Sequence, residues 1–234
     1  MDANYYRGSE YNVKFEDSKY RKTPKKWTQT ERFMVFQAIW DVSNKLSKIL
    51  LLPPPVAFKL TYGVPEITPF IFDFDCPQCT NDSGDQVGMY TNSSRNISVG
   101  TFSPGYLNGV HNVVHELGHA FENRLWYSPK NGDTFRIGRT WLARVQEMDQ
   151  LFPDRPNNPG VEERDPLYGF AGHRYNWQQS ASGSAAEEFA DMFLGWTYNT
   201  WEGDFDGLRA PEGQMRAEFM DLVMPFLVVW AATK

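Results

Sequence analysis

Five segments of the chain predict helices, and in the first of them Phe33, Phe36, Trp40 and Leu46 recur at helical intervals. They are residues 28–51, 109–126, 139–152, 184–201 and 213–232. The first opens with Thr28 and Glu31 at the spacing of a capping box, and three prolines at 53–55 end it.

Strand-like runs gather in the first half of the chain. The runs VAFKLTYG (56–63) and FIFDF (70–74) both predict strands. Residues 87–101 hold two short strand-forming runs separated by Asn, Ser and Arg, which predicts a hairpin directly before the second helix. Residues 153–183 show no periodicity, so a long functional loop or a missed element lies there. The order of elements predicts an α+β fold.

Length and charge indicate the number of domains and exclude one class of partner. The 234 residues contain no repeat, so we expect an N-terminal arm over residues 1–27 and one domain over residues 28–234. The basic cluster at 19–27 is expected to be a solvated part of that arm. A net charge of −6 argues against nucleic-acid binding.

Neither end of the chain predicts a membrane segment. Residues 219–234 are apolar, but Asp221 and Pro225 interrupt them and they fall short of the roughly 20 residues of a membrane span, so we expect a buried helix. Residues 1–14 lack the apolar core of a signal peptide. We therefore expect either a cytoplasmic protein or one whose export segment has already been removed, and the sequence does not separate the two.

Cys76 and Cys79 form a single CxxC pair. One pair supplies half of a tetrahedral zinc site, and no second pair completes it. A disulfide, free thiols, or a metal site completed by Asp or His all remain open. Structural cysteines are favoured over a redox site, because no thioredoxin-like strand and helix surround them.

The predicted helix 109–126 places two histidines on one side. At about 100° per residue, His119 lies about 40° from His115 on a helical wheel, while an apolar arc occupies the far side. That arc consists of Val110, Val113, Leu117, Ala120 and Phe121. Histidines that pack in a core would more naturally fall within the arc.

Residues 115–119 read HELGH, an HExxH motif. Histidines one turn apart can both bind one zinc ion, and Glu116 at the edge of their face can serve as a general base toward a water on the ion. Gly118 lowers helix stability but permits close approach of another backbone. His111 is expected to be a helix-start or supporting residue, because eight residues of helix rise about 12 Å, too far for all three histidines to reach one ion.

A third ligand must come from another element. His173 is one candidate, although it lies in the predicted long loop. Glu187 is the stronger candidate, because it lies beside the apolar arc of the predicted helix 184–201. Asp191, one turn later, is placed to hold the free ring nitrogen of a ligating histidine.

With HExxH at 115–119 and ExxxD at 187–191, the chain resembles the gluzincin metallopeptidases over residues 85–200. The piece AAEEFADMF resembles the third-ligand helix of the lethal-factor type, and the preceding hairpin resembles the edge hairpin of thermolysin-like enzymes. The resemblance implies a zincin-like fold, in which an N-terminal helix and a small mixed sheet with an edge hairpin pack on the HExxH helix and the C-terminal part is helical. It also implies Zn²⁺ held by His115, His119 and Glu187. It also implies a peptide-binding edge strand at Gly88, Met89, Tyr90 and Thr91, and an oxyanion-stabilising group at Tyr175 or, second, His173.

The expected activity is hydrolysis of peptide bonds in a peptide or protein substrate by a zinc-bound water that Glu116 activates. Two other functions remain open. One is a catalytically silent zinc-binding scaffold or interaction protein, and the other is a narrowly specific regulatory or effector protease.

Overall fold

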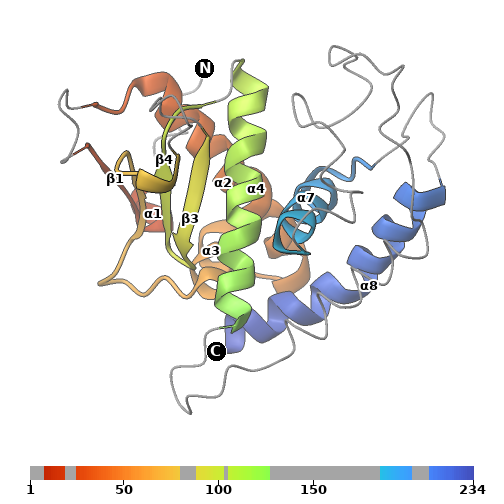
Figure 1. Cartoon of the computed structure of the whole chain (residues 1–234). Coiled ribbons are helices and arrows are strands. Elements are labelled where there is room, and N and C mark those ends of the chain that lie inside the picture. The colour runs from red at the N-terminus through yellow and green to blue at the C-terminus, as the bar shows by residue number, and fades with distance from the viewer. Residues whose placement is uncertain (1–7, 19–24, 80–87, 103–104, 127–184, 202–210) are drawn as a thin grey trace, which may run out of the picture.

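The computed structural model describes residues 8–18, 25–79, 88–102, 105–126, 185–201 and 211–234 (Figure 1). Two short elements, α1 (Gly8–Tyr11) and β1 (Val13–Glu16), come first. The remaining elements are α2 (Gln29–Leu50), α3 (Pro54–Tyr62), β2 (Phe70–Asp73), the 3₁₀ turn η2 (Pro77–Cys79), β3 (Met89–Ser93), β4 (Asn96–Val99), α4 (Tyr106–Trp126), α7 (Ala185–Tyr198) and α8 (Pro211–Thr233). The predicted helix 139–152 and the segment 153–183 lie outside the described residues.

The four strands form one mixed sheet in the order β1-β2-β4-β3. Strands β1, β2 and β4 are parallel to one another, and β3 pairs antiparallel with β4 at the edge. The predicted strand at 70–74 and the predicted hairpin are thus confirmed, as is the α+β class. Phe72 and Ile97 are fully buried on the inner face, while Asp73 on the opposite face bonds to Ser98 and Asn96.

The expected N-terminal arm is wrong for part of its length. Residues Val13–Glu16 form β1, which pairs along its whole length with β2. Tyr11 and Trp27 are buried, and the Trp27 ring stacks on Phe74 at 4.2 Å between centroids. The four-residue strand is too short to show a clear alternation, and its stability comes from aromatic packing that the local sequence does not reveal.

The predicted strand at 56–63 is also wrong, because these residues form α3. Its buried residues, Ala57, Phe58, Thr61 and Tyr62, recur at helical spacing. Two prolines stand at the first helical positions, where the missing N–H costs nothing, and Gly63 ends the helix with a φ of 62°. The prolines that separate α3 from α2 therefore also begin α3.

Helix α2 has the capping box that the sequence predicts. The Thr28 hydroxyl accepts a hydrogen bond from the Glu31 N–H, and the Glu31 carboxylate accepts one from the Thr28 N–H. Burial raises the pKa of Glu31, but hydrogen bonds from Thr28 and Lys25 outweigh burial and lower it overall.

Helix α8 was expected to be buried, and it is buried on one side only. Met220, Met224 and Val228 are fully buried, whereas Leu222 is 78% exposed and Phe226 is 61% exposed. Its composition is apolar all round, so the sequence does not show which side packs. No helix in the described ranges combines the length and apolarity that crossing a bilayer requires.

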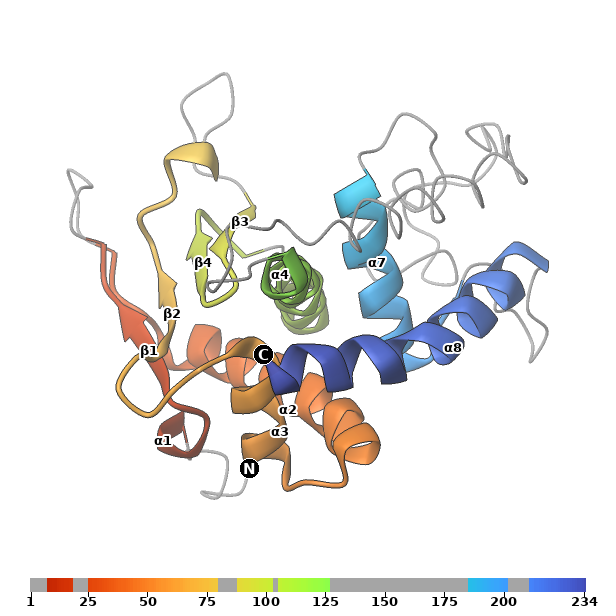
Figure 2. The same cartoon turned by 90° about the horizontal axis from the view of Figure 1, so that it is seen from below.

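Helix α4 lies between the sheet and α7, and α8 runs across the end of this arrangement (Figures 1 and 2). The ends of α4 and α8 meet where Arg124 donates a hydrogen bond to the Ala231 carbonyl. The apolar arc predicted for α4 is fully or nearly fully buried. Helix α7 packs against His115 and Gly118 and also against Phe121 of the apolar arc.

Candidate metal centre

Helices α4 and α7 pack closely and in opposite directions. The ring of His111 lies 4.9 Å from that of Tyr198, and Gly118 lies against Ala190. Residue numbers thus fall along α7 as they rise along α4. A Cβ at position 118 would come within 3.0 Å of the Ala190 Cα, so Gly118 permits this approach, as its place in the sequence predicts.

The two motif histidines point their Nε2 atoms at each other. These atoms lie 3.1 Å apart, and the ring planes are nearly perpendicular at 83°. His115 is 4% exposed, so this meeting point is largely removed from water. On the helical wheel the histidines lie away from the apolar arc. His115 is nevertheless buried, because α7 packs against it.

Asp191 fixes the orientation of His115, as the sequence predicts. Its Oδ1 lies 2.6 Å from the His115 Nδ1. A carboxylate at this distance accepts a hydrogen bond, so Nδ1 carries a hydrogen, and when the ring is neutral its lone pair is on Nε2. That lone pair faces His119.

Asp191 is completely buried, and its second oxygen, Oδ2, has no hydrogen-bond partner among the described residues. An ionised carboxylate is costly to bury unless positive charge lies near it. A cation bound by His115 would place that charge one imidazole away. The burial of Asp191 therefore fits a cation at the Nε2 atoms.

The geometry of the two histidines fits a zinc ion. Two ring nitrogens that bind one zinc at about 2.0–2.1 Å in a tetrahedral arrangement lie about 3.3 Å apart. The observed 3.1 Å between the Nε2 atoms is close to this value. Among side chains that the structure describes, no three His, Cys, Asp or Glu residues are grouped for a metal, and the Glu187 side chain lies outside this set.

The backbone of Glu187 belongs to the first turn of α7, one turn before Asp191. Since α7 runs opposite to α4, and Asp191 contacts His115, residue 187 comes level with the turn of α4 that holds His119. Glu187 as the third ligand stays a prediction, because nothing in the structure describes its side chain.

Glu122 is a carboxylate near the site that sequence reasoning missed. Its Oε2 lies 3.9 Å from the Nδ1 of His119, three residues earlier on α4, and the residue is 9% exposed. The sequence feature that could have identified Glu122 is its spacing from His119, since residues three apart share a helix face. Each motif histidine therefore has a carboxylate on its Nδ1 side.

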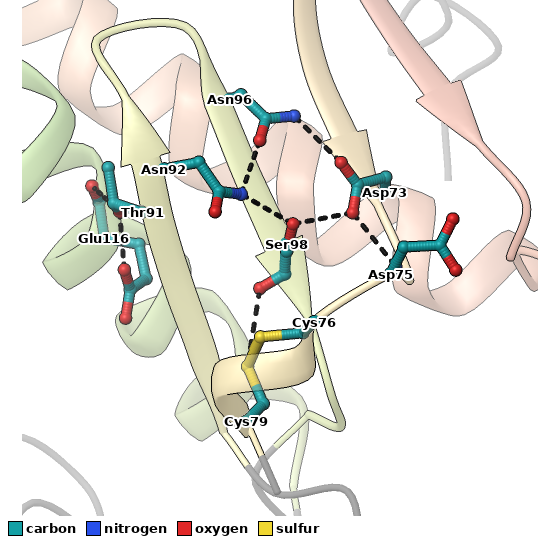
Figure 3. The surroundings of a disulfide bond; sticks show 9 residues. All are labelled: Asp73, Asp75, Cys76, Cys79, Thr91, Asn92, Asn96, Ser98 and Glu116. Atoms are coloured by element: carbon teal, nitrogen blue, oxygen red, sulfur yellow. Dashed lines mark hydrogen bonds between the residues drawn. A yellow bond between two sulfur atoms is a disulfide. The ribbon is translucent and has the colours of Figure 1, made fainter. Parts of the chain in front are cut away.

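Glu116 points toward the edge strand rather than toward α7. Its Oε2 lies 2.5 Å from the Thr91 Oγ1, and the Thr91 hydroxyl is also 3.0 Å from the Glu116 main-chain oxygen (Figure 3). Glu116 is 8% exposed. The carboxylate is held between α4 and β3, next to the histidines in sequence but on a different side of the helix.

Of the four residues predicted to bind a peptide, two direct their main-chain N–H and C=O groups toward β4 and two direct them toward the outer edge of β3. The Gly88 carbonyl accepts hydrogen bonds from the N–H groups of Gly100 and Thr101, so Gly88 faces β4. Main-chain groups of successive residues point to opposite edges of a strand, so Tyr90 also faces β4 while Met89 and Thr91 face outward. Only Met89 and Thr91 therefore offer main-chain groups at this edge.

His111 lies one turn before the two motif histidines. Its ring packs against Tyr198, whose hydroxyl donates a hydrogen bond to Asp41 at 2.8 Å. Burial lowers the pKa of His111. These contacts join His111 to α7, and its supporting role at the site stays a prediction. Tyr175 and His173, the predicted oxyanion-stabilising residues, lie outside the described residues.

Cys76 and Cys79 form a disulfide, one of the alternatives that the sequence left open (Figure 3). The Cys79 sulfur lies 3.8 Å from the Ser98 carbonyl of β4. This contact places η2 beside β4. With both sulfurs bonded to each other, the CxxC pair does not contribute thiolates to a metal site.

Comparison with known proteins finds no matching family model, no similar curated protein and no similar solved structure.

Proposed function

We propose that the protein is a zinc-dependent metallopeptidase of the gluzincin type. The observation that carries the proposal is the meeting of the His115 and His119 Nε2 atoms, 3.1 Å apart, with the buried Asp191 carboxylate on the far ring nitrogen of His115. A histidine pair braced in this way is the usual form of a zinc half-site.

The proposed ligands are His115, His119 and Glu187. The two imidazoles bind through Nε2, and Asp191 holds His115 in the required tautomer. Glu187 is proposed because its backbone stands one turn before Asp191 on the helix that packs antiparallel to α4. Three protein ligands leave one position for water or substrate, which distinguishes a catalytic zinc site from a structural one.

Zinc bound here would supply Lewis acidity, which polarises a carbonyl group and makes water acidic near neutral pH. The Glu116 carboxylate accepts the proton of the attacking water at Oε and then delivers it to the leaving amine nitrogen. Glu116 is not one of the proposed ligands, so its carboxylate is available for proton transfer.

The proposed substrate is an extended peptide that adds to β3. Met89 and Thr91 present outward main-chain N–H and C=O groups, which recognise any backbone in the β conformation. The mixed sheet, with an antiparallel edge strand in the hairpin directly before α4, supports a zincin-like arrangement. Side-chain preference would come from residues around this edge.

The proposal is tested by measuring bound zinc and cleavage of a peptide library by the purified chain. We expect one zinc per chain and cleavage that a chelator stops and added zinc restores. Glu116→Gln should retain zinc but lose at least a hundredfold in kcat, because the amide cannot accept the proton.

Cleavage by Glu116→Gln at the wild-type rate would refute the role of Glu116. Zinc binding without cleavage of any peptide or protein would instead indicate a silent scaffold. Cleavage of one protein partner alone would indicate a narrowly specific protease.

A further inference from the structure

We propose that Thr91 is a positioning residue that holds the Glu116 carboxyl group in its working orientation. The inference rests on the proposed function, since it concerns the residue assigned to proton transfer. It concerns the Thr91 side chain, whereas the peptide-binding role of β3 concerns main-chain groups.

Two contacts of one hydroxyl carry the inference. The Thr91 Oγ1 lies 2.5 Å from the Glu116 Oε2 and 3.0 Å from the Glu116 main-chain oxygen (Figure 3). Both acceptors belong to the same residue, so the hydroxyl binds the base at its backbone and at its carboxyl group. With Glu116 only 8% exposed, little water is available to replace this contact.

One hydroxyl hydrogen and two acceptors give Thr91 a partner in each half of the reaction. While Glu116 is a carboxylate, the hydroxyl donates to Oε2. The water's proton then goes to Oε1, and Oε2, now the carbonyl oxygen of the neutral acid, still accepts the hydrogen bond from the Thr91 hydroxyl. The carboxyl group can thus stay in place while its charge changes.

The position of Thr91 on the strand links the base to the substrate edge. Its main-chain groups face outward from β3, away from β4, while its side chain contacts Glu116. A peptide paired with β3 would therefore be held by the same residue that orients the base. Small misplacements of reacting groups reduce rates by large factors, so this orientation affects turnover more than binding.

The test compares Thr91→Val, which keeps the shape and removes the hydroxyl, with Thr91→Ser, which keeps the hydroxyl. Thr101→Val is the matched control, because Thr101 is exposed just beyond β4 of the same hairpin. We would measure kcat and KM on a cleaved peptide, zinc content, and the Glu116 side-chain position in crystal structures of the zinc-free variants.

We expect Thr91→Val to lower kcat at least tenfold with KM within about twofold, and Thr91→Ser and Thr101→Val to stay within about threefold of wild type in kcat. The Glu116 carboxyl should move or adopt several conformers only in Thr91→Val. An unchanged Glu116 position in Thr91→Val would overturn the inference, as would equal kcat losses in Thr91→Val and Thr91→Ser. If the wild-type chain cleaves nothing, the proposed function fails, and the crystal structures still decide whether Thr91 positions Glu116.

Discussion

The two ring nitrogens of His115 have different surroundings, and this difference defines the site at the scale of single residues. Nδ1 faces the buried Asp191 carboxylate at 2.6 Å, and Nε2 faces the His119 Nε2 at 3.1 Å. Because the carboxylate holds the hydrogen on Nδ1, the lone pair at Nε2 is directed at the proposed metal position. The orientation is fixed by a residue 76 positions away in the chain.

Asp191→Asn should therefore weaken zinc binding. The amide keeps the shape of the side chain but removes the charge that stabilises the imidazole as a ligand, and it can present an N–H to the Nδ1 hydrogen. We expect the dissociation constant for zinc to rise about 10–100-fold. Titration against a competing chelator measures this change.

The control for Asp191→Asn is Asp221→Asn, which alters an exposed carboxylate on α8. It should leave the zinc dissociation constant unchanged. Equal zinc affinity in wild type and Asp191→Asn would show that the His115–Asp191 contact has no part in metal binding.

At the scale of single residues, the sequence predicts the contacts that follow from the spacing of residues within one helix. The positions of His115 and His119 follow from four residues of separation, and the Asp191 contact follows from the apolar arc of its own helix. The Thr91–Glu116 contact did not follow, because it joins α4 to a strand and depends on how the sheet is placed against the helix.

At the scale of elements, the approach of α4 to α7 is the feature on which the site depends. Gly118→Ala should gain roughly 1 kcal/mol in helix propensity. The new Cβ would lie 3.0 Å from the Ala190 Cα and 3.1 Å from the Phe193 Cβ, and overpacking of this kind costs about 1–3 kcal/mol. We expect a net loss of up to about 2 kcal/mol in the free energy of unfolding, together with weaker zinc binding.

Gly109→Ala, on the same helix, is the matched control for Gly118→Ala. Its Cβ would meet the Met34 Sδ, and the end of a flexible methionine side chain can move away. Chemical denaturation of both variants should therefore show Gly118→Ala to be the less stable. The reverse order would mean that close packing against α7 does not explain Gly118.

The wrong prediction of a strand at 56–63, where the structure has α3, also arises at the scale of elements. Apolar residues at 56, 58, 60 and 62 alternate like a strand, yet the buried positions 57, 58, 61 and 62 follow a helix. Alternation alone does not decide between the two in so short a segment. Proline at the first helical position and glycine just after the last were the signals that favoured the helix.

At the scale of the whole molecule, one hydrophobic core joins the parts that carry the site. Buried residues of α2, α3, the sheet, α4, α7 and α8 belong to a single cluster, and the Tyr62 hydroxyl of α3 bonds to the Leu117 carbonyl of α4. The sequence predicted most of the described helices, the mixed sheet and the hairpin beside the HExxH helix. It did not predict β1 or α3, because their packing depends on contacts between distant segments that local patterns do not encode.

Because α4 and α7 both belong to this core, metal bound between them should stabilise the entire fold. A ligand that binds only the folded state at 100 times its dissociation constant contributes about 2.7 kcal/mol, which for a chain of this size raises Tm by roughly 5–10 °C. Thermal unfolding of the chelated protein, with and without added zinc, measures this shift. Magnesium should have little effect, because it prefers oxygen ligands. His119→Ala should lose most of the zinc response, and an equal Tm increase in that variant would place the stabilising zinc elsewhere in the protein.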